Sequence, residues 1–179
     1  SEGAACVILA SEDKAREITD TPIWLTGIGM GTDWGMLGYR KKLEEFQSSI
    51  SAAQAAYRMA GISNPRKEID VAELHDAFTG TEILNYEDVD FCKPGEGGRL
   101  IDEGVVELDG DLPVNTSGGL IGCGHAVGAT GVMQTIEIVM QLKEQCGRRQ
   151  VKNAKRGLIQ SMGGTSNAWT ICIVLERKD

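Results

Sequence analysis

Apolar residues recur along the chain at two spacings, which divide it into predicted helices and strands. The clearest helical spacing covers residues 43–60, where apolar residues repeat every three or four positions and Gly61 provides a stop. Residues 79–88 show the same spacing over a shorter length, and residues 132–142 show it before a stop at Gly147. Each helix has one apolar face, so we expect these faces to pack on a sheet.

Short apolar runs between the helices predict the strands of that sheet. Residues 4–10, 23–30 and 71–75 have the length and composition of strands. The runs 157–161 and 169–176 are separated by a glycine-containing turn, and we interpret them as a hairpin at the edge of the sheet. Helices and strands in this order define an α/β fold.

Composition and charge narrow the class of protein. The 179 residues are 41% hydrophobic and 25% charged, as expected for one folded domain. A formal net charge of -8 argues against nucleic acid or an anionic membrane as a partner. The longest uncharged stretch, residues 112–136, is too rich in glycine for a membrane span. Five cysteines without a CxxC spacing predict a reduced, cytoplasmic protein that binds no structural metal.

A glycine-rich segment, residues 115–131, leads into the helix predicted from Val132. Its six glycines let backbone N–H groups approach a ligand, and the start of the helix adds partial positive charge. The segment is therefore a candidate for holding an anionic oxygen, with a tight turn that binds nothing as the alternative.

The chain has two histidines, and both lie at junctions between predicted elements. His125 follows Gly124 in the glycine-rich segment, where little side-chain bulk surrounds it. His75 begins the motif HDAF, between a predicted strand and a predicted helix. An imidazole can move protons near neutral pH, so both are candidates for catalysis. The alternative for His75 is a structural role, in which it orders the junction by bonding to Asp76 or to the backbone.

Longer motifs carry a resemblance to the thiolases. They are SEGAACVIL, ELHDAF, CKPGEGGRLIDEG, NTSGGLIGCGHAVGATG and SMGGTSNAW. ELHDAF is similar to the family's HDCF motif, and the glycine-rich segment is similar to its GGLxxxGHPxGATG signature. The chain is thereby identified as a member of the thiolase superfamily. It resembles the C-terminal half of a sterol-carrier-protein-like or archaeal-type thiolase, in the acetyl-CoA acetyltransferase family.

The resemblance implies a fold and a division of the chain. We expect the C-terminal half of a thiolase-like α/β fold, a mixed five-stranded sheet with helices packed on its faces. Residues 1–20 would be the end of the N-terminal domain, its last strand and a linker, and residues 21–179 the C-terminal domain. The chain opens without an initiator methionine or a signal peptide, as if entered part-way. The nucleophilic cysteine would come from the missing N-terminal half, since none of the five cysteines here has a matching context.

The resemblance also implies an activity and partners. The activity is acyl-CoA C-acyltransferase chemistry, a Claisen condensation or the thiolytic cleavage of 3-ketoacyl-CoA, with a coenzyme A thioester as substrate and no covalently bound cofactor. The implied partners are acyl-CoA, the N-terminal half, further copies in a homodimer or higher oligomer, and a small zinc-ribbon/OB-fold protein.

Site residues follow from the matching positions. His125 matches the histidine that activates the nucleophilic thiol, although Ala126 replaces the proline after it, which frees the backbone there. His75 matches the first residue of HDCF, from which it would donate to the thioester oxygen directly or through water. Gly163 matches a glycine whose N–H completes an oxyanion hole. The positions expected beside the coenzyme A arm and the acyl group are Ser117, Gly118 and Gly119.

The second catalytic thiol of many thiolases is absent. Ser161 stands at its position, and Ala77 replaces the cysteine of HDCF. Cys123 is the one remaining thiol near the site, and it is either the second acid/base or a small residue that fits a tight loop. Two other functions therefore stay open: a thiolase-like aldolase that cleaves β-hydroxyacyl-CoA, and a catalytically silent thiolase-fold subunit of a heteromeric complex.

Overall fold

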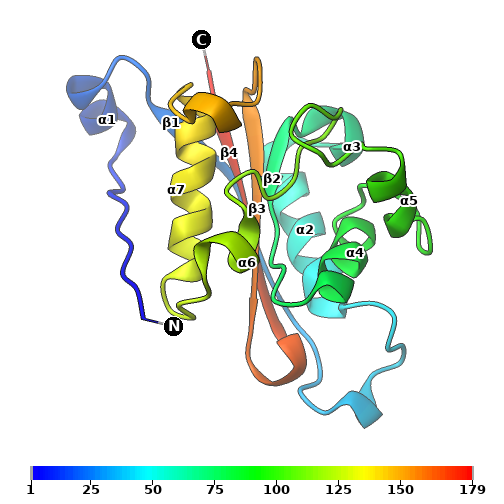
Figure 1. The fold of residues 1–179 in the computed structure, drawn as a ribbon. Coiled ribbons are helices and arrows are strands. Elements are labelled where there is room, and N and C mark those ends of the chain that lie inside the picture. Colours follow the sequence, from blue (N-terminus) through cyan, green and yellow to red (C-terminus); the bar gives the residue numbers. More distant parts are fainter. Residues whose placement is uncertain (1, 179) are drawn as a thin grey trace.

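A mixed four-stranded sheet lies at the centre of the chain in the computed structural model, which describes residues 2–178 (Figure 1). The strands are β1 (Ile23–Thr32), β2 (Val71–Glu73), β3 (Arg156–Gly163) and β4 (Trp169–Arg177). Their order is β1-β4-β3-β2, in which β4 is antiparallel to both of its neighbours and β2 is parallel to β3. The sheet therefore has β1 at one edge and the short β2 at the other.

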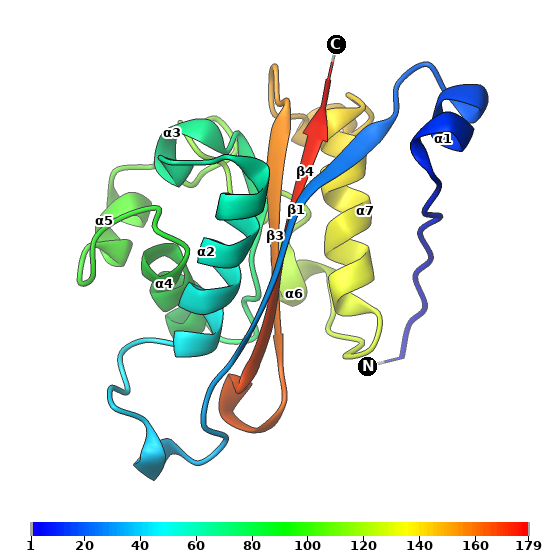
Figure 2. The ribbon, with the colours of Figure 1, turned by 180° about the vertical axis from the view of Figure 1, so that it is seen from behind.

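Two helices cover opposite faces of the sheet, as seen from both sides in Figures 1 and 2. The helix α2 (Gln47–Ala60) packs on one face, together with α4 (Thr79–Asp88), and α7 (Thr130–Leu142) packs on the other. Each face has its own cluster of buried apolar residues, represented by Ala52 on the α2 side and Ile138 on the α7 side. The result is a three-layer α/β arrangement.

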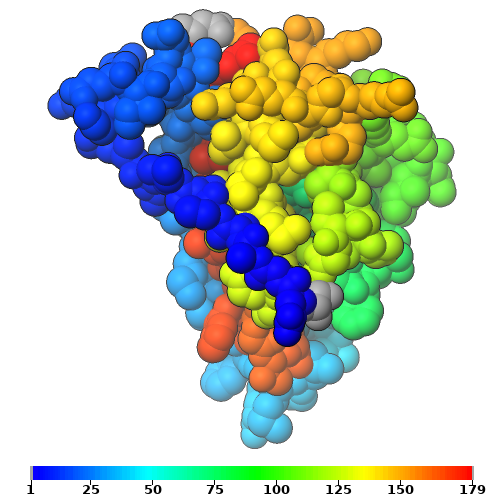
Figure 3. All heavy atoms as spheres, turned by 60° about the vertical axis from the view of Figure 1, so that its left-hand side comes forward, coloured from blue at the N-terminus to red at the C-terminus, as the bar shows by residue number. Residues whose placement is uncertain are grey.

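Shorter elements connect these layers. They are α1 (Glu12–Ile18), η1 (Leu37–Tyr39), α3 (Pro65–Glu68), α5 (Gly97–Asp102), α6 (Gly119–Cys123), η2 (Gly147–Arg149) and η3 (Thr165–Asn167). The extended segment before α1 runs over the surface beside α7 (Figure 3).

Glycines on β1 explain how closely α2 approaches the sheet. Gly27, Gly29 and Gly31 occupy alternate positions, so all three face the same side. A Cβ atom on Gly29 would lie 2.0 Å from the carbonyl oxygen of Ala52, on α2. The helix backbone therefore rests directly on the strand backbone, an approach that any side chain at these positions would prevent.

The helical spacing in the sequence identifies the main helices. The helix predicted over residues 79–88 is confirmed with those bounds as α4. The helix predicted from residue 43 begins at Gln47, because Phe46 is extended and its N–H donates to the Asp88 carboxylate at 2.9 Å. A contact with another element thus decides where this helix starts.

Three expectations about strands are wrong. Residues 4–10 form no strand: they are extended, find no strand partner within residues 2–178, and expose 89% of Ile8. The sheet has four strands within the described residues and not the five expected of the C-terminal half, and Val114 adds only an isolated parallel bridge to Ala72 of β2. The hairpin of β3 and β4 lies in the middle of the sheet and not at its edge, because β1 and β2 pair along its outer sides. An apolar run indicates burial, but it does not indicate which strands will flank it.

Within residues 2–178, no helix combines the length and apolar character needed to cross a membrane. The same residues contain no group of three or more His, Cys, Asp or Glu side chains arranged to hold a metal ion. All five cysteines are free, with Cys146 and Cys172 buried.

Candidate active site

Three segments that are distant in sequence meet around one pocket of about 410 Å³. They are the segment that follows β2, α6 with the segment after it, and the end of β3 with the turn to β4. The residues that line it are His75, Asp76, Ala77, Phe78, Leu120, Ile121, His125, Val127, Met162, Gly163, Gly164 and Asn167. Since β2 and β3 are parallel, their carboxyl ends meet at the same end of the sheet, where α/β proteins place their ligands.

The two histidines are neighbours in this pocket. The ring centroids of His75 and His125 lie 5.1 Å apart, and the rings are at 79° to one another, edge to face. Fifty positions separate the residues in sequence, so the fold alone brings them together. The structure thus places His75, His125 and Gly163, three of the expected site residues, in one pocket wall.

Buried amide side chains hold the backbone of His75. Its N–H donates to Gln160 Oε1 at 2.9 Å, and its carbonyl oxygen accepts from Asn85 Nδ2 at 2.7 Å. Gln160 Nε2 also donates to Asn85 Oδ1, at 3.0 Å, which ties the two amides together. Since both backbone groups of His75 are engaged, the backbone that carries its ring is fixed just after β2.

The ring of His75 is neutral at physiological pH. Only 3% of the residue is exposed, and burial, followed by the charge of His125, lowers its pKa to about 4. Its Nδ1 atom is buried and has no hydrogen-bond partner among the described residues. His75 is therefore suited to donate or accept a hydrogen bond as a neutral imidazole, and not to act as a cation.

His125 is held from the start of α7. Its Nδ1 atom lies 2.7 Å from Thr130 Oγ1. The carbonyl oxygen of Ala126 accepts hydrogen bonds from the N–H groups of Ala129 and Thr130, at 2.7 and 3.0 Å. These bonds order the turn after His125, so its backbone is held in place although Ala126 stands where the family has proline.

The turn that carries Gly163 is held on its outer side. Ser166 and Asn167 both adopt left-handed backbone conformations, with φ of 54° and 56°, which is uncommon for residues other than glycine. Ser48, on α2, donates to the carbonyl oxygen of Asn167 at 3.1 Å, and the guanidinium of Arg40 donates to that of Ser166. Contacts with two other parts of the chain thus fix the turn at the pocket.

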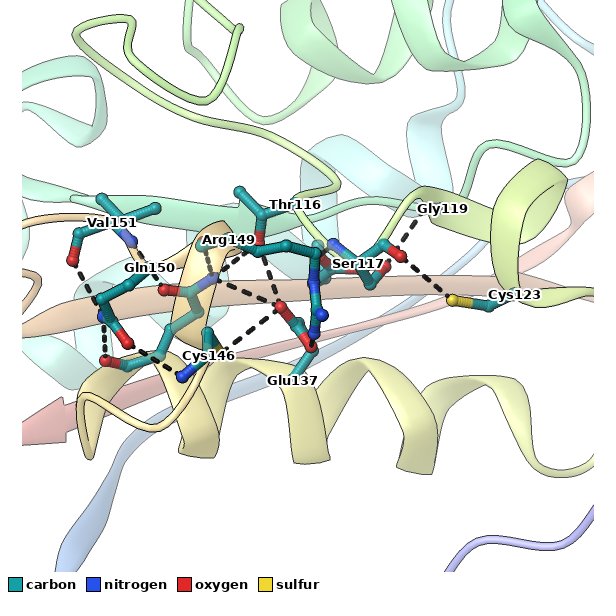
Figure 4. A network of polar contacts seen from close by, with 11 residues as sticks. Thr116, Ser117, Gly119, Cys123, Glu137, Cys146, Arg149, Gln150 and Val151 are labelled. Carbon is teal, nitrogen blue, oxygen red and sulfur yellow. Dashed lines mark hydrogen bonds and ion pairs between the residues drawn. The ribbon is translucent and has the colours of Figure 1, made fainter.

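Cys123 lies outside the histidine pocket. Its Sγ atom donates to the carbonyl oxygen of Ser117 at 3.2 Å (Figure 4). It borders a separate cavity of about 30 Å³, enough for one water molecule, which Glu73 and Asp76 also line. The structure therefore does not bring this thiol together with the histidine pair.

The glycine-rich segment is anchored by acidic side chains. Ser117 donates to Glu73 through its N–H, at 3.1 Å, and through its hydroxyl, at 2.7 Å. The N–H of Gly118 donates to the carbonyl oxygen of Asn115, and that of Gly119 donates to Ser117 Oγ. These N–H groups are thus paired within the protein, so the segment does not offer them to an anionic oxygen.

Glu73, Asn85 and Gln160 are site residues that the sequence did not reveal. Glu73 is 1% exposed, and burial raises its pKa to about 7. The one signal for it was a charged residue inside the short apolar run before His75. Asn85 and Gln160 are fully buried on a predicted helix and a predicted strand, where polar residues usually mark the solvent side.

Comparison with known proteins identifies the class of this domain. Residues 29–177 match the family described as "Thiolase C-terminal domain-like". The chain belongs to this family, as its motifs predicted.

Curated relatives are acyltransferases and sterol carrier proteins. The chain is 40% identical to the acetyl-CoA acetyltransferase of Methanothermobacter thermautotrophicus, over 97% of the chain and 45% of that protein. It is 38% identical to sterol carrier protein 2 of Oryctolagus cuniculus, over 91% of the chain and 30% of that protein. The chain thus spans less than half the length of these relatives.

Solved structures share the fold. The structure described as "Ltp2-ChsH2(DUF35) aldolase" superposes with a TM-score of 0.80 at 25% identity, covering 93% of the chain and 42% of the other. Human mitochondrial 3-ketoacyl-CoA thiolase superposes with a TM-score of 0.59 at 20% identity, covering 94% of the chain and 34% of the other, which supports the fold alone.

Proposed function

We propose that the chain is the C-terminal half of an acyl-CoA C-acyltransferase of the thiolase type, which performs a Claisen condensation or cleaves 3-ketoacyl-CoA thiolytically. The observation that carries this proposal is the pair His75 and His125, in edge contact at one pocket with Gly163. The family and the 40% identity to an acetyl-CoA acetyltransferase support it.

In the proposed mechanism, a cysteine from the N-terminal half attacks the thioester carbonyl, the bond from that carbonyl to the sulfur of coenzyme A breaks, and coenzyme A leaves with the proton that His125 returns to it. His125 takes the proton of the cysteine thiol, and the neutral ring of His75 donates to the oxygen on which negative charge develops. The N–H of Gly163 assists at the same or a second oxyanion. The segment Ser117–Gly119 lies outside the pocket lining and its N–H groups are paired internally, so it would contribute by supporting the pocket residues Leu120 and Ile121 that follow it.

The proposal includes a division of the chain and a set of partners. Residues 1–20 would complete the N-terminal domain, and residues 21–179 would form the C-terminal domain. The assembly would be a cytoplasmic homodimer or higher oligomer that needs no bound cofactor. A small zinc-ribbon/OB-fold protein would be a further partner. The aldolase of similar fold is named together with ChsH2(DUF35), which supports a heteromeric complex here.

The test is turnover of acetoacetyl-CoA with free coenzyme A by this chain, co-expressed with the polypeptide that supplies the nucleophilic cysteine. We expect loss of the 3-ketoacyl thioester, and we expect His125→Ala to lower kcat by about a thousandfold, because the thiol then lacks its base. Cys146→Ala, a buried cysteine outside the pocket, is the matched control and should retain turnover. Turnover that is indifferent to His125→Ala would contradict the proposal.

A second candidate is a thiolase-like aldolase that cleaves β-hydroxyacyl-CoA. The observation that favours it is the position of Cys123, because no thiol among residues 2–178 lines the histidine pocket. Aldol cleavage needs a base for the hydroxyl proton and a donor for the enolate oxygen, roles that His125 and His75 can fill without a second thiol. Cleavage of a β-hydroxyacyl-CoA without turnover of acetoacetyl-CoA would select this function. No turnover of either substrate would select a silent subunit.

A further inference from the structure

We infer that Thr130 is a positioning residue, which holds His125 in the tautomer that carries its proton on Nδ1 and leaves the lone pair of Nε2 for the reaction. The catalytic meaning of this inference rests on the proposed function, in which His125 is the base. The tautomer itself is a property of the chain and can be measured without turnover.

Thr130 is placed to control the ring. It is the first residue of α7, follows His125 by five positions and is 1% exposed. Its Oγ1 atom lies 2.7 Å from His125 Nδ1 and 3.2 Å from the carbonyl oxygen of Ala126. The hydroxyl thus bridges the imidazole and a backbone acceptor, beside the small cavity that Cys123 also borders.

Counting protons assigns the direction of both bonds. A carbonyl oxygen can only accept, so the contact between Thr130 and Ala126 is attractive only if the hydroxyl proton points to Ala126. A threonine hydroxyl often donates to the carbonyl four residues before it at the start of a helix. Since the hydroxyl has a single proton, a hydroxyl that donates to Ala126 can only accept from His125, and that bond then uses the proton of Nδ1. In a neutral imidazole, Nε2 is then the basic atom.

The opposite arrangement would leave two oxygens facing each other. If Thr130 donated to Nδ1, its oxygen would lie 3.2 Å from the oxygen of Ala126 without a proton between them. His125 would then carry its proton on Nε2 and would have no lone pair on that atom to accept a proton from a thiol. The hydroxyl of Thr130 therefore decides which nitrogen of His125 can act as base.

The tautomer can be read directly, because the chain has only two histidines. Long-range ¹H–¹⁵N correlation spectra of the ¹⁵N-labelled chain near neutral pH give the two ring-nitrogen shifts of each histidine, and the spectrum of His125→Gln assigns them. We expect the Nδ1–H pattern for His125 in the wild type and in Thr130→Ser, which keeps the hydroxyl. In Thr130→Val, which has the same shape but no acceptor, we expect the two shifts to move in opposite directions toward the Nε2–H form.

The backbone amide spectrum of the same sample is the control for an intact fold, because the ring of His75 is in edge contact with that of His125 and is not independent of its tautomer. An Nε2–H pattern for wild-type His125 would overturn the inference, and so would an unchanged pattern in Thr130→Val. If Thr130→Val fails to fold, the wild-type spectrum alone decides.

Kinetics of the assembled enzyme provide the second readout. We expect Thr130→Val to lower kcat by roughly tenfold to a hundredfold, as supporting hydrogen bonds to functional histidines commonly do, with little change in KM. Thr130→Ser should restore the rate. An Nδ1–H tautomer in an assembly that turns over no substrate would refute the proposed function and leave the role of Thr130 in place.

Discussion

Burial shifts the pKa values of two residues near the end of β2, Glu73 and His75, in opposite directions. Burial disfavours the charged form of each group, so it lowers the pKa of His75 to about 4 and raises that of Glu73 to about 7. Glu73 holds Ser117, while His75 faces the pocket. The same dry environment thus keeps the imidazole neutral and brings the supporting carboxyl close to its own midpoint.

The lowered pKa of His75 makes stability depend on pH. Between its ordinary value of 6.5 and the folded value of about 4, the unfolded chain binds more protons at this ring than the folded chain does. The free energy of unfolding therefore falls as the pH drops through this window. We expect wild type to lose about 2 kcal/mol more than His75→Phe between about pH 8 and pH 5, measured by urea unfolding.

His75→Phe keeps an aromatic ring and both backbone hydrogen bonds but cannot titrate. Glu73 and Asp88, whose pKa values burial raises to about 7, are present in both proteins, and their contributions have the opposite sign. The difference between the two pH profiles therefore isolates His75. Parallel profiles would mean that His75 keeps its ordinary pKa in the folded chain, because its ring is solvated or its charged form is stabilised.

At the scale of elements, the contact between α2 and β1 depends on glycines that no other residue can replace. The helix backbone lies over Gly27, Gly29 and Gly31, and the facing residues on α2 are small, including Ala52 and Ala56. Close packing of this kind leaves no space into which an added methyl group can relax.

Gly29→Ala should destabilise the chain without touching the pocket. The new Cβ would meet the Ala52 carbonyl at 2.0 Å, so the helix must shift, which costs about 3 kcal/mol and lowers Tm by roughly 10 °C. Gly38→Ala is the matched control, because nothing lies within 4 Å of its Cβ position. Differential scanning calorimetry of both variants checks the prediction. Equal Tm values would show that α2 does not rest on β1 as described.

The elements that sequence patterns predicted well are those whose pattern comes from their own packing. The helix α4 has the predicted bounds, and α7 follows the predicted spacing, because one face of each is buried along its whole length. The start of α2 was missed because Asp88, from another element, sets it. The strand expected at residues 4–10 failed because apolar residues form a strand only where a partner offers hydrogen bonds.

The same distinction applies to the candidate site. His75 and His125 were identifiable because both stand at element junctions within motifs. The amide side chains that hold the backbone of His75 were not identifiable from the sequence. Asn85 and Gln160 look like solvent-facing residues in the sequence, and only the fold shows that they are buried. The position of Cys123 was left open by the sequence, because one bond to Ser117 decides which cavity the thiol borders.

At the scale of the whole molecule, one face of the sheet is incompletely covered. Side chains of β1 alternate, so Ile28 and Met30 point away from α2, and they are 43% and 69% exposed. The apolar residues Ile8 and Leu9 are also exposed in the extended segment before α1. One edge of β1 pairs with β4, and its other edge has no strand partner within residues 2–178. Exposed apolar surface next to an unpaired edge promotes association.

We therefore expect the chain on its own to associate as its concentration rises. Met30→Lys should reduce this association, because a charge on the exposed face opposes burial there. Ile101→Lys, which changes an exposed apolar residue on α5, is the matched control and should behave as the wild type. Sedimentation velocity over a range of concentrations measures the effect. A chain that stays monomeric throughout would contradict the expectation.

The construction of the histidine pocket from three distant segments has a practical consequence. A compound that fits among His75, His125 and Gly163 meets its complete binding surface only when β2, β3 and the α6–α7 segment are all in place. It binds the folded chain and not the unfolded one, and each tenfold rise in its concentration above Kd adds about 1.4 kcal/mol to the stability. Melting curves recorded with a panel of thioesters can therefore rank acyl groups by affinity before any catalytic assay exists.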